Sequence, residues 1–163
     1  MTRSASRTAA EALRVVLPYS PFRVPIRDGR KTVNLSPNGD AKRVFYTGNP
    51  SYAQASIRLG HDQMRGDAWA LTLEEMDGSK HSLSDGAYLY TVTLGWAVPG
   101  PAPDGDNIIA SIKWALDGIA AALGMDDRHF TLAGSPTVER LPRGSQEWTE
   151  LCIAPRQSAE VTP

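Results

Sequence analysis

Cysteine is almost absent from this 163-residue sequence, which contains Cys152 alone. A single cysteine excludes a disulfide within the chain, and it also excludes a metal cluster built on several thiolates. We expect Cys152 to behave as a small apolar residue of a terminal strand, because that is a common role of an isolated cysteine.

Long apolar runs are also missing. No stretch approaches the ~20 apolar residues of a membrane-spanning helix, and residues 1–10 lack the apolar centre of a signal peptide. We therefore expect a cytoplasmic protein with no membrane partner. Neither GxxxxGK[ST] nor GxGxxG occurs, so no nucleotide-binding loop is indicated. The three histidines form no HExxH motif and are expected to be ordinary surface or core residues.

The composition is that of one globular domain, with 41% hydrophobic and 21% charged residues. We expect a single domain over residues 1–163, with frayed tails at 1–10 and 155–163, which are rich in Ser, Thr, Ala and Pro.

The charge is unevenly distributed, although the net charge is only −1. Residues 1–65 hold eleven Lys or Arg and four acids, hence +7, whereas the remainder holds six and fourteen, hence −8. Such asymmetry suggests a polyanion-binding half. Within the long irregular basic stretch between Pro18 and Asn49, the expected DNA phosphate contacts are Arg30, Lys31, Lys42 and Arg43.

Strand and helix signals alternate along the chain. The pattern predicts an α/β (α+β) fold with a mixed sheet packed by helices. Residues 67–76 are compatible with either a strand or a helix. The other predicted elements are a strand at 13–17 ended by Pro18, a hairpin near Asp28-Gly29, a helix from about 50 to 65 weakened by Gly60, an inner strand at 88–98, and a closing hairpin of 138–141 with 148–153.

The segment from Pro103 to Phe130 predicts a helix of about four turns. Asp104 or Asp106 can cap its first turn, and Gly124 is a C-terminal stop signal. The apolar side chains fall on one arc at ~100° per residue and are expected to face the core: Ile108, Ile109, Ile112, Ala115, Leu116, Ile119 and Leu123.

A separate polar stripe of the same helix carries Asp106, Lys113 and Asp117, and Asp126-Asp127 follows the helix. An exposed, solvated face would explain the stripe equally well. If the two loops meet, however, three or four carboxylates converge, and a hard cation such as Mg²⁺ would relieve their repulsion. An EF-hand is excluded, because its fifth and twelfth positions would be Ile108 and Ala115.

This pattern resembles that of the RusA-type Holliday junction resolvases, small endonucleases common in phages. The resemblance is specific over about 30 residues, from Pro103 to Phe130. Asp104 and Asp106 match the first two metal-binding acids of the family, and Asp127 matches the third catalytic acid. Three further residues match positions of the family's motif, namely Asn107, Lys113 and Asp117. Asp126 is the residue directly before the third acid.

The resemblance implies a RusA-like fold and a homodimer that acts on four-way DNA junctions in recombination and repair. It also implies phosphodiester hydrolysis with Mg²⁺ (or Mn²⁺) held by Asp104, Asp106 and Asp127, with Lys113 near the phosphate. Two alternatives remain: a non-catalytic DNA-binding or regulatory protein with the same fold, and a nuclease of the same chemistry acting on flaps or other branched DNA.

Overall fold

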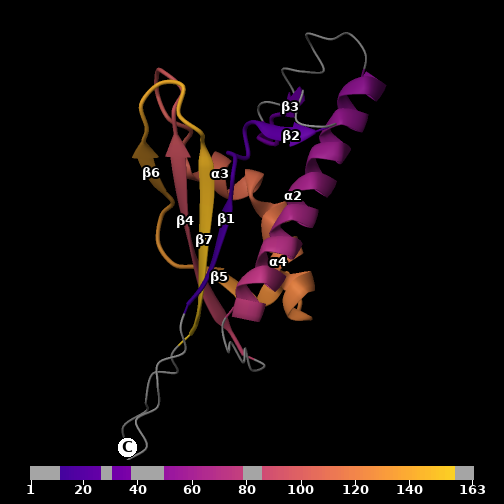
Figure 1. Ribbon diagram of the computed structural model, residues 1–163, viewed down its shortest axis with the longest axis vertical. Helices are drawn as coiled ribbons and strands as arrows, with labels where there is room; N and C mark the ends of the chain where they lie inside the picture. Colours follow the sequence, from indigo (N-terminus) through magenta and orange to yellow (C-terminus); the bar gives the residue numbers. More distant parts are fainter. Residues whose placement is uncertain (1–11, 27–30, 38–49, 79–85, 157–163) are drawn as a thin grey trace, which may run out of the picture.

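The computed structural model describes residues 12–26, 31–37, 50–78 and 86–156. Its main feature is a five-stranded mixed sheet with helices packed on one face (Figure 1), as the sequence predicts. The strands of this sheet are β1 (Leu13–Leu17), β4 (Tyr88–Trp96), β5 (Phe130–Leu132), β6 (Thr137–Arg140) and β7 (Trp148–Pro155).

Strand β4 is the centre of the sheet. Strand β7 lies between β1 and β4 and is antiparallel to both. The other edge of β4 is shared by β5, which pairs with its first half, and β6, which pairs with its second half, both in parallel. The predicted inner strand is therefore confirmed.

This topology gives the sheet two distinct ends. At the carboxyl end, where β4 finishes at Trp96, β1 and β6 also finish and β7 begins. At the amino end, where β4 begins at Tyr88, β5 begins and β7 finishes. These two names, carboxyl end and amino end, are used below.

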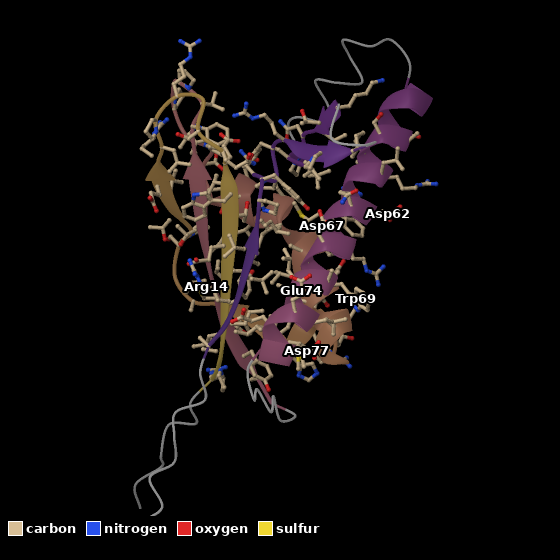
Figure 2. The ribbon with its side chains drawn as sticks, in the orientation of Figure 1. Arg14, Asp62, Asp67, Trp69, Glu74 and Asp77 are labelled. Atoms are coloured by element: carbon tan, nitrogen blue, oxygen red, sulfur yellow. The ribbon has the colours of Figure 1, made fainter. Side chains whose placement is uncertain are left out.

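A single helix, α2 (Pro50–Gly78), covers β1 and the lower part of the sheet in Figure 1. It is longer than the predicted helix and shows that residues 67–76 are helical. Gly60 does not end it, because the lack of a side chain lets the helix approach Leu35; a Cβ there would lie 3.0 Å from that residue's Cδ2. Figure 2 shows Asp62, Asp67, Glu74 and Asp77 along this helix.

The predicted helix after Asp104 is present but interrupted. It consists of α3 (Gly105–Ser111) and α4 (Lys113–Leu123), separated at Ile112. Gly124 ends α4 with a left-handed backbone, at φ 69°, as its position suggested. A short 3₁₀ turn, η1 (Asp127–His129), then leads into β5; neither of these two elements was predicted.

Two hairpins were predicted, and the structure confirms one of them. Strands β2 (Val24–Ile26) and β3 (Lys31–Val33) pair antiparallel on either side of the predicted turn at Asp28-Gly29, which lies outside the described residues. The closing hairpin is wrong. Its strands exist as β6 and β7, but they flank β4 on opposite sides, because β7 is inserted between β1 and β4.

The core lies between the sheet and the helices. Alternate residues of β1, β4 and β7 are buried and face α2, α3 and α4. Cys152 lies in the last strand, as expected, but on the other face of the sheet, where it is partly buried. Strand β7 reaches Pro155, and the remaining predicted tails fall outside the described residues. Among the helices that the structure describes, none is long and apolar enough to cross a membrane.

Helices α2 and α4 approach so closely at Gly118 that a side chain does not fit. A Cβ at Gly118 would lie 2.2 Å from the backbone oxygen of Arg65. We predict that Gly118→Ala lowers the free energy of unfolding by about 1–3 kcal/mol, because the helices must separate.

The matched control is Gly66→Ala in α2, where a Cβ meets nothing within 4 Å. This control should stabilise by ~0.5–1 kcal/mol through helix propensity. Equal effects of both variants in urea denaturation would contradict the close packing.

Candidate active site

Asp104 is held in place by its role as the N-terminal cap of α3. Its side-chain Oδ1 accepts a hydrogen bond of 2.9 Å from the backbone N–H of Asn107, and its carbonyl accepts one of 3.1 Å from Ile108. Aspartate is favoured there because it satisfies N–H groups that have no partner within the helix. The cap leaves one carboxylate oxygen of Asp104 uncommitted.

Asp104 and Asp106 line the same open depression, with a volume of about 480 Å³. Both side chains are exposed, and neither forms an ion pair with any described residue. The remaining walls come from Ile109 of α3 and from the connection between β5 and β6, namely Leu132, Gly134, Ser135 and Pro136. The depression lies beside the middle of β4, because Leu132 pairs with Tyr90 and Thr137 pairs with Thr93.

Asp127 lies at the amino end of the sheet. It begins η1, directly before β5, whose first residue pairs with the first residue of β4. Asp104 lies beside the connection from β5 to β6, and Asp127 is not among the residues that line that depression. Over the four described ranges, no group of three or more His, Cys, Asp or Glu side chains is placed to hold a metal ion. A single chain does not bring together the three carboxylates expected to share a cation.

Asp127 instead belongs to an amino-end cluster with Asp117, Asp126 and Lys113. Burial raises the pKa of Asp117, and its hydrogen bond with Asp127 and the charge of that neighbour raise it further. The positive charges of Lys113 and of Arg65 from α2 oppose this shift. Asp117 therefore ionises less readily than an ordinary aspartate, although cations supplied by the protein itself lie nearby.

Asp126 has the opposite environment. Its Oδ1 accepts a hydrogen bond of 3.0 Å from the backbone N–H of Arg128, and this bond is the main cause that lowers the pKa of Asp126. The Arg128 side chain adds an exposed ion pair at 3.6 Å. Asp126 thus caps η1, as Asp104 caps α3.

Lys113 is exposed at the start of α4, beyond the interruption at Ile112. Its Nζ lies 5.8 Å from the ring centroid of Trp114, which stacks on His61 of α2 at 4.2 Å and 23°. Burial lowers the pKa of His61, while the charge of Asp62 partly opposes the change. This histidine packs between helices, as its lack of a motif suggested.

The structure describes one of the four residues predicted to contact DNA phosphates. Lys31 lies exposed on β3. Arg30, Lys42 and Arg43 lie outside the described residues, so their assignment stays a prediction.

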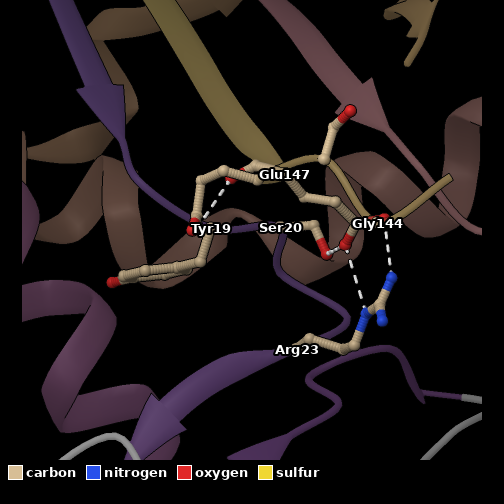
Figure 3. Close-up of a pocket in the computed structure, with 7 residues that line it drawn as sticks. Tyr19, Ser20, Arg23, Gly144 and Glu147 are labelled. Atoms are coloured by element: carbon tan, nitrogen blue, oxygen red, sulfur yellow. Dashed lines mark hydrogen bonds and ion pairs between the residues drawn. The ribbon is translucent and has the colours of Figure 1, made fainter. Parts of the chain in front are cut away.

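Sequence reasoning missed a second polar group, which lies at the carboxyl end of the sheet and is centred on Glu147 (Figure 3). This carboxylate is only 7% exposed and accepts hydrogen bonds from Ser20 Oγ at 2.8 Å, Arg23 Nε at 3.2 Å and the Ala97 N–H at 3.0 Å. Arg23 Nη2 adds an ion pair at 2.8 Å. No spacing rule could find this group, since its residues come from segments far apart in the sequence.

Comparisons with known proteins add little. No protein-family model and no curated protein matches the chain. Among solved structures, the chain is similar to IspF of Plasmodium falciparum, described as a CDP complex. The two are 12% identical, the match covers 90% of this chain and 97% of that chain, and the TM-score is 0.28. At that TM-score, the similarity bears on neither fold nor function.

The opposite environments of Asp117 and Asp126 predict opposite effects on stability. Because the native pKa of Asp117 is raised, the folded state binds more protons between pH 3.8, its ordinary value, and the raised value, and stability falls as pH rises through that range. Asp117→Asn should therefore raise the thermal midpoint at pH 7, and the gain should vanish as pH falls towards 3.8.

Asp126→Asn is the matched control for this prediction. The lowered pKa of Asp126 means that its ionised form stabilises the native state above pH 3.8, and that this contribution is lost as pH falls through the native pKa. The variant should lower the midpoint slightly at pH 7, and less in acid. Calorimetry from pH 3 to 7 measures both effects, and a shift of the same sign in both variants would contradict the cluster geometry.

Proposed function

We propose that this protein is a metal-dependent endodeoxyribonuclease that cleaves Holliday junctions or related branched DNA in the cytoplasm. The observation that carries the proposal is the pair of exposed carboxylates, Asp104 and Asp106, which line one open depression without an ion-pair partner among the described residues. The resemblance of the surrounding motif to RusA-type resolvases supports the same activity.

The donor chemistry of this pair fits a hard divalent cation. Mg²⁺ is usually held by one or two carboxylates, while waters and substrate phosphate oxygens complete its coordination. Asp106 and the uncommitted oxygen of Asp104 can supply such a set. When bound, Mg²⁺ or Mn²⁺ supplies an activated water and offsets charge on the scissile phosphate.

The protein's own contribution is to fix the two acids before substrate arrives. The cap bond to Asn107 holds the Asp104 carboxylate in one orientation, and the position of Asp106 in the first turn of α3 ties it to the same helix. Prior orientation of this kind lowers the entropy lost on reaching the reactive geometry.

Asp127 and Lys113 do not share this depression within one chain, so we assign them no contact with the same phosphate there. A homodimer would present two such carboxylate pairs to the symmetric strands of a junction, which is the arrangement that the resemblance implies. The separation of Asp127 is also the observation that favours the second candidate, a DNA-binding protein of this fold without catalysis.

Incubation of the protein with labelled four-way junction, fork and linear duplex, each with Mg²⁺, Mn²⁺ or EDTA, tests the proposal. We expect metal-dependent cleavage of the branched substrates. Asp106→Asn should reduce cleavage at least ~100-fold while leaving binding intact or stronger, because one charge that repels phosphate is removed. Asp117→Asn, which lies in α4 and outside the depression, should retain cleavage. Near wild-type cleavage by the Asp106 variant would refute the assignment, and binding without cleavage by the wild type would favour the second candidate.

Metal binding should also stabilise the fold. At ten times Kd, a bound ion adds about 1.4 kcal/mol to the free energy of unfolding, which raises the midpoint of a domain of this size by a few degrees. We expect this rise with up to ~10 mM Mg²⁺ at constant ionic strength, so that screening does not contribute.

Two variants divide the possible ligands of this ion. The Asp104→Asn/Asp106→Asn protein should lose the response, and Asp127→Asn should keep it. If Asp127→Asn also abolished the response, the three acids would form one site, which two chains would have to share.

A further inference from the structure

Glu147 is a buried charge that holds three segments together. Its hydrogen-bond donors are Ser20 and Arg23 from the segment after β1, and the N–H of Ala97 directly after β4. Glu147 itself lies in the β6–β7 connection. A buried carboxylate is costly unless donors surround it, so this arrangement strongly constrains the side chains that supply them. Arg23 is the charged donor.

The guanidinium of Arg23 is held on one side only. Its Nε and Nη2 engage the two oxygens of Glu147 as a bidentate pair, whereas its side chain remains 48% exposed. A guanidinium has five N–H donors, so the outer donors remain available to an anion. Because the side chain is already oriented, anion binding would cost little additional side-chain conformational entropy.

A pocket of about 230 Å³ opens beside Arg23, and its walls are mostly polar. Figure 3 shows Arg23 reaching from its loop towards Glu147 and the Gly144 connection. The other lining residues are Tyr19, Ser20, Ser145 and Gln146. The side chains of Tyr19, Ser20 and Gln146 already donate hydrogen bonds within the protein, so the outer N–H groups of Arg23 are the charged donors that this pocket offers to a phosphate oxygen.

The loop carrying Arg23 is anchored independently on its other side. Tyr19 donates its hydroxyl to Asp67 Oδ2 of α2 at 2.7 Å, and its backbone oxygen accepts from Thr149 Oγ1 at 2.8 Å. Burial, and then the bond and charge of Asp67, raise the pKa of Tyr19, so the hydroxyl keeps its proton. The pocket therefore has walls fixed by helix and sheet.

This pocket opens at the carboxyl end of the sheet, whereas the depression of Asp104 and Asp106 lies along the β5–β6 edge, beside the middle of β4. Arg23 precedes β2, Glu147 precedes β7, and Ala97 follows β4 seven positions before Asp104. The exposed Arg143 lies in the same β6–β7 connection. By contrast, α2 bears the acids labelled in Figure 2, which repel a polyanion.

We propose that Arg23 binds a backbone phosphate of the DNA in this pocket, and that Glu147 is a positioning residue that orients its guanidinium. The inference deepens the proposed function and rests on it. It adds a substrate contact at the carboxyl end of the sheet, outside the depression that holds the carboxylate pair.

The test is equilibrium binding of a labelled four-way junction in EDTA over a salt series, where cleavage cannot interfere. Each phosphate contact adds about 0.9 to the log–log salt slope for duplex DNA. Arg23→Ala should therefore flatten the slope by about one unit and weaken binding. An unchanged slope and affinity would overturn the proposal.

Arg14→Ala is the matched control. Arg14 is also an exposed arginine paired with a glutamate, Glu150, but it lies on β1 away from the pocket. Its removal changes the net charge equally and should leave the salt slope as in the wild type. Equal flattening by both variants would show a general charge effect and would also overturn the proposal.

Two further variants guard against loss of folding. Arg23→Ala leaves Glu147 buried without its charged partner, so Arg23→Ala/Glu147→Gln is measured beside it, and each midpoint is recorded. Arg23→Lys keeps the charge without the bidentate geometry and should weaken binding less than Arg23→Ala. If the folded double variant binds as the wild type does, Arg23 does not contact phosphate.

A positioning role predicts coupling between the two residues. Glu147→Gln should weaken binding when Arg23 is present and have no further effect on the slope in the Arg23→Ala background. Equal effects in both backgrounds would assign Glu147 a merely structural role.

The outcomes separate this inference from the proposed function. Flattening by Arg23→Ala in a protein that never cleaves would refute the nuclease and keep the phosphate contact. Cleavage that depends on Asp106, with binding indifferent to Arg23, would do the reverse.

Discussion

The parallel pairing of β4 with β5 is the constraint on which the distribution of functional groups depends. A parallel partner must begin at the same end as the strand it joins, so the chain has to return along the whole sheet between them. Here α3 and α4 make that return. The two halves of one acidic motif lie on either side of this crossover and do not share a site: Asp104 and Asp106 line a depression beside the β5–β6 connection, whereas Asp126 caps η1 at the amino end.

The sequence predicted the elements better than their partners. Local signals identified β1, β4 and the helix after Asp104, because strand alternation, capping and a C-terminal glycine act within a few residues. Pairing depends on distant segments, and the 138–141 and 148–153 strands were wrongly joined for that reason. The 29-residue helix α2 was predicted to end near residue 65 and to be weakened by Gly60, since propensity alone cannot show that Gly60 is needed for close approach to the hairpin.

For the candidate site, too, the sequence predicted local features but not contacts between distant segments. Asp104 as a cap followed from its place before an apolar helix, and the structure confirms it. The group formed by Ser20, Arg23, Ala97 and Glu147 was not predictable, because no local pattern marks a buried carboxylate that takes its donors from three separated segments. Glutamate in a loop ordinarily predicts a solvated surface residue. Tertiary contacts alone show that this one is enclosed.

The two groups of carboxylates differ in what the protein already provides for them. In the amino-end cluster, Lys113 and Arg65 lie near Asp117, so its negative charge is partly offset within the chain. Asp104 and Asp106 face an open depression, and no described cation pairs with either. An external cation therefore has most to contribute at this carboxylate pair, while at the carboxyl end of the sheet Arg23 is held by Glu147 with its outer donors exposed. A phosphodiester, which needs a cation near its scissile group and fixed donors along its backbone, is a ligand class that suits both features.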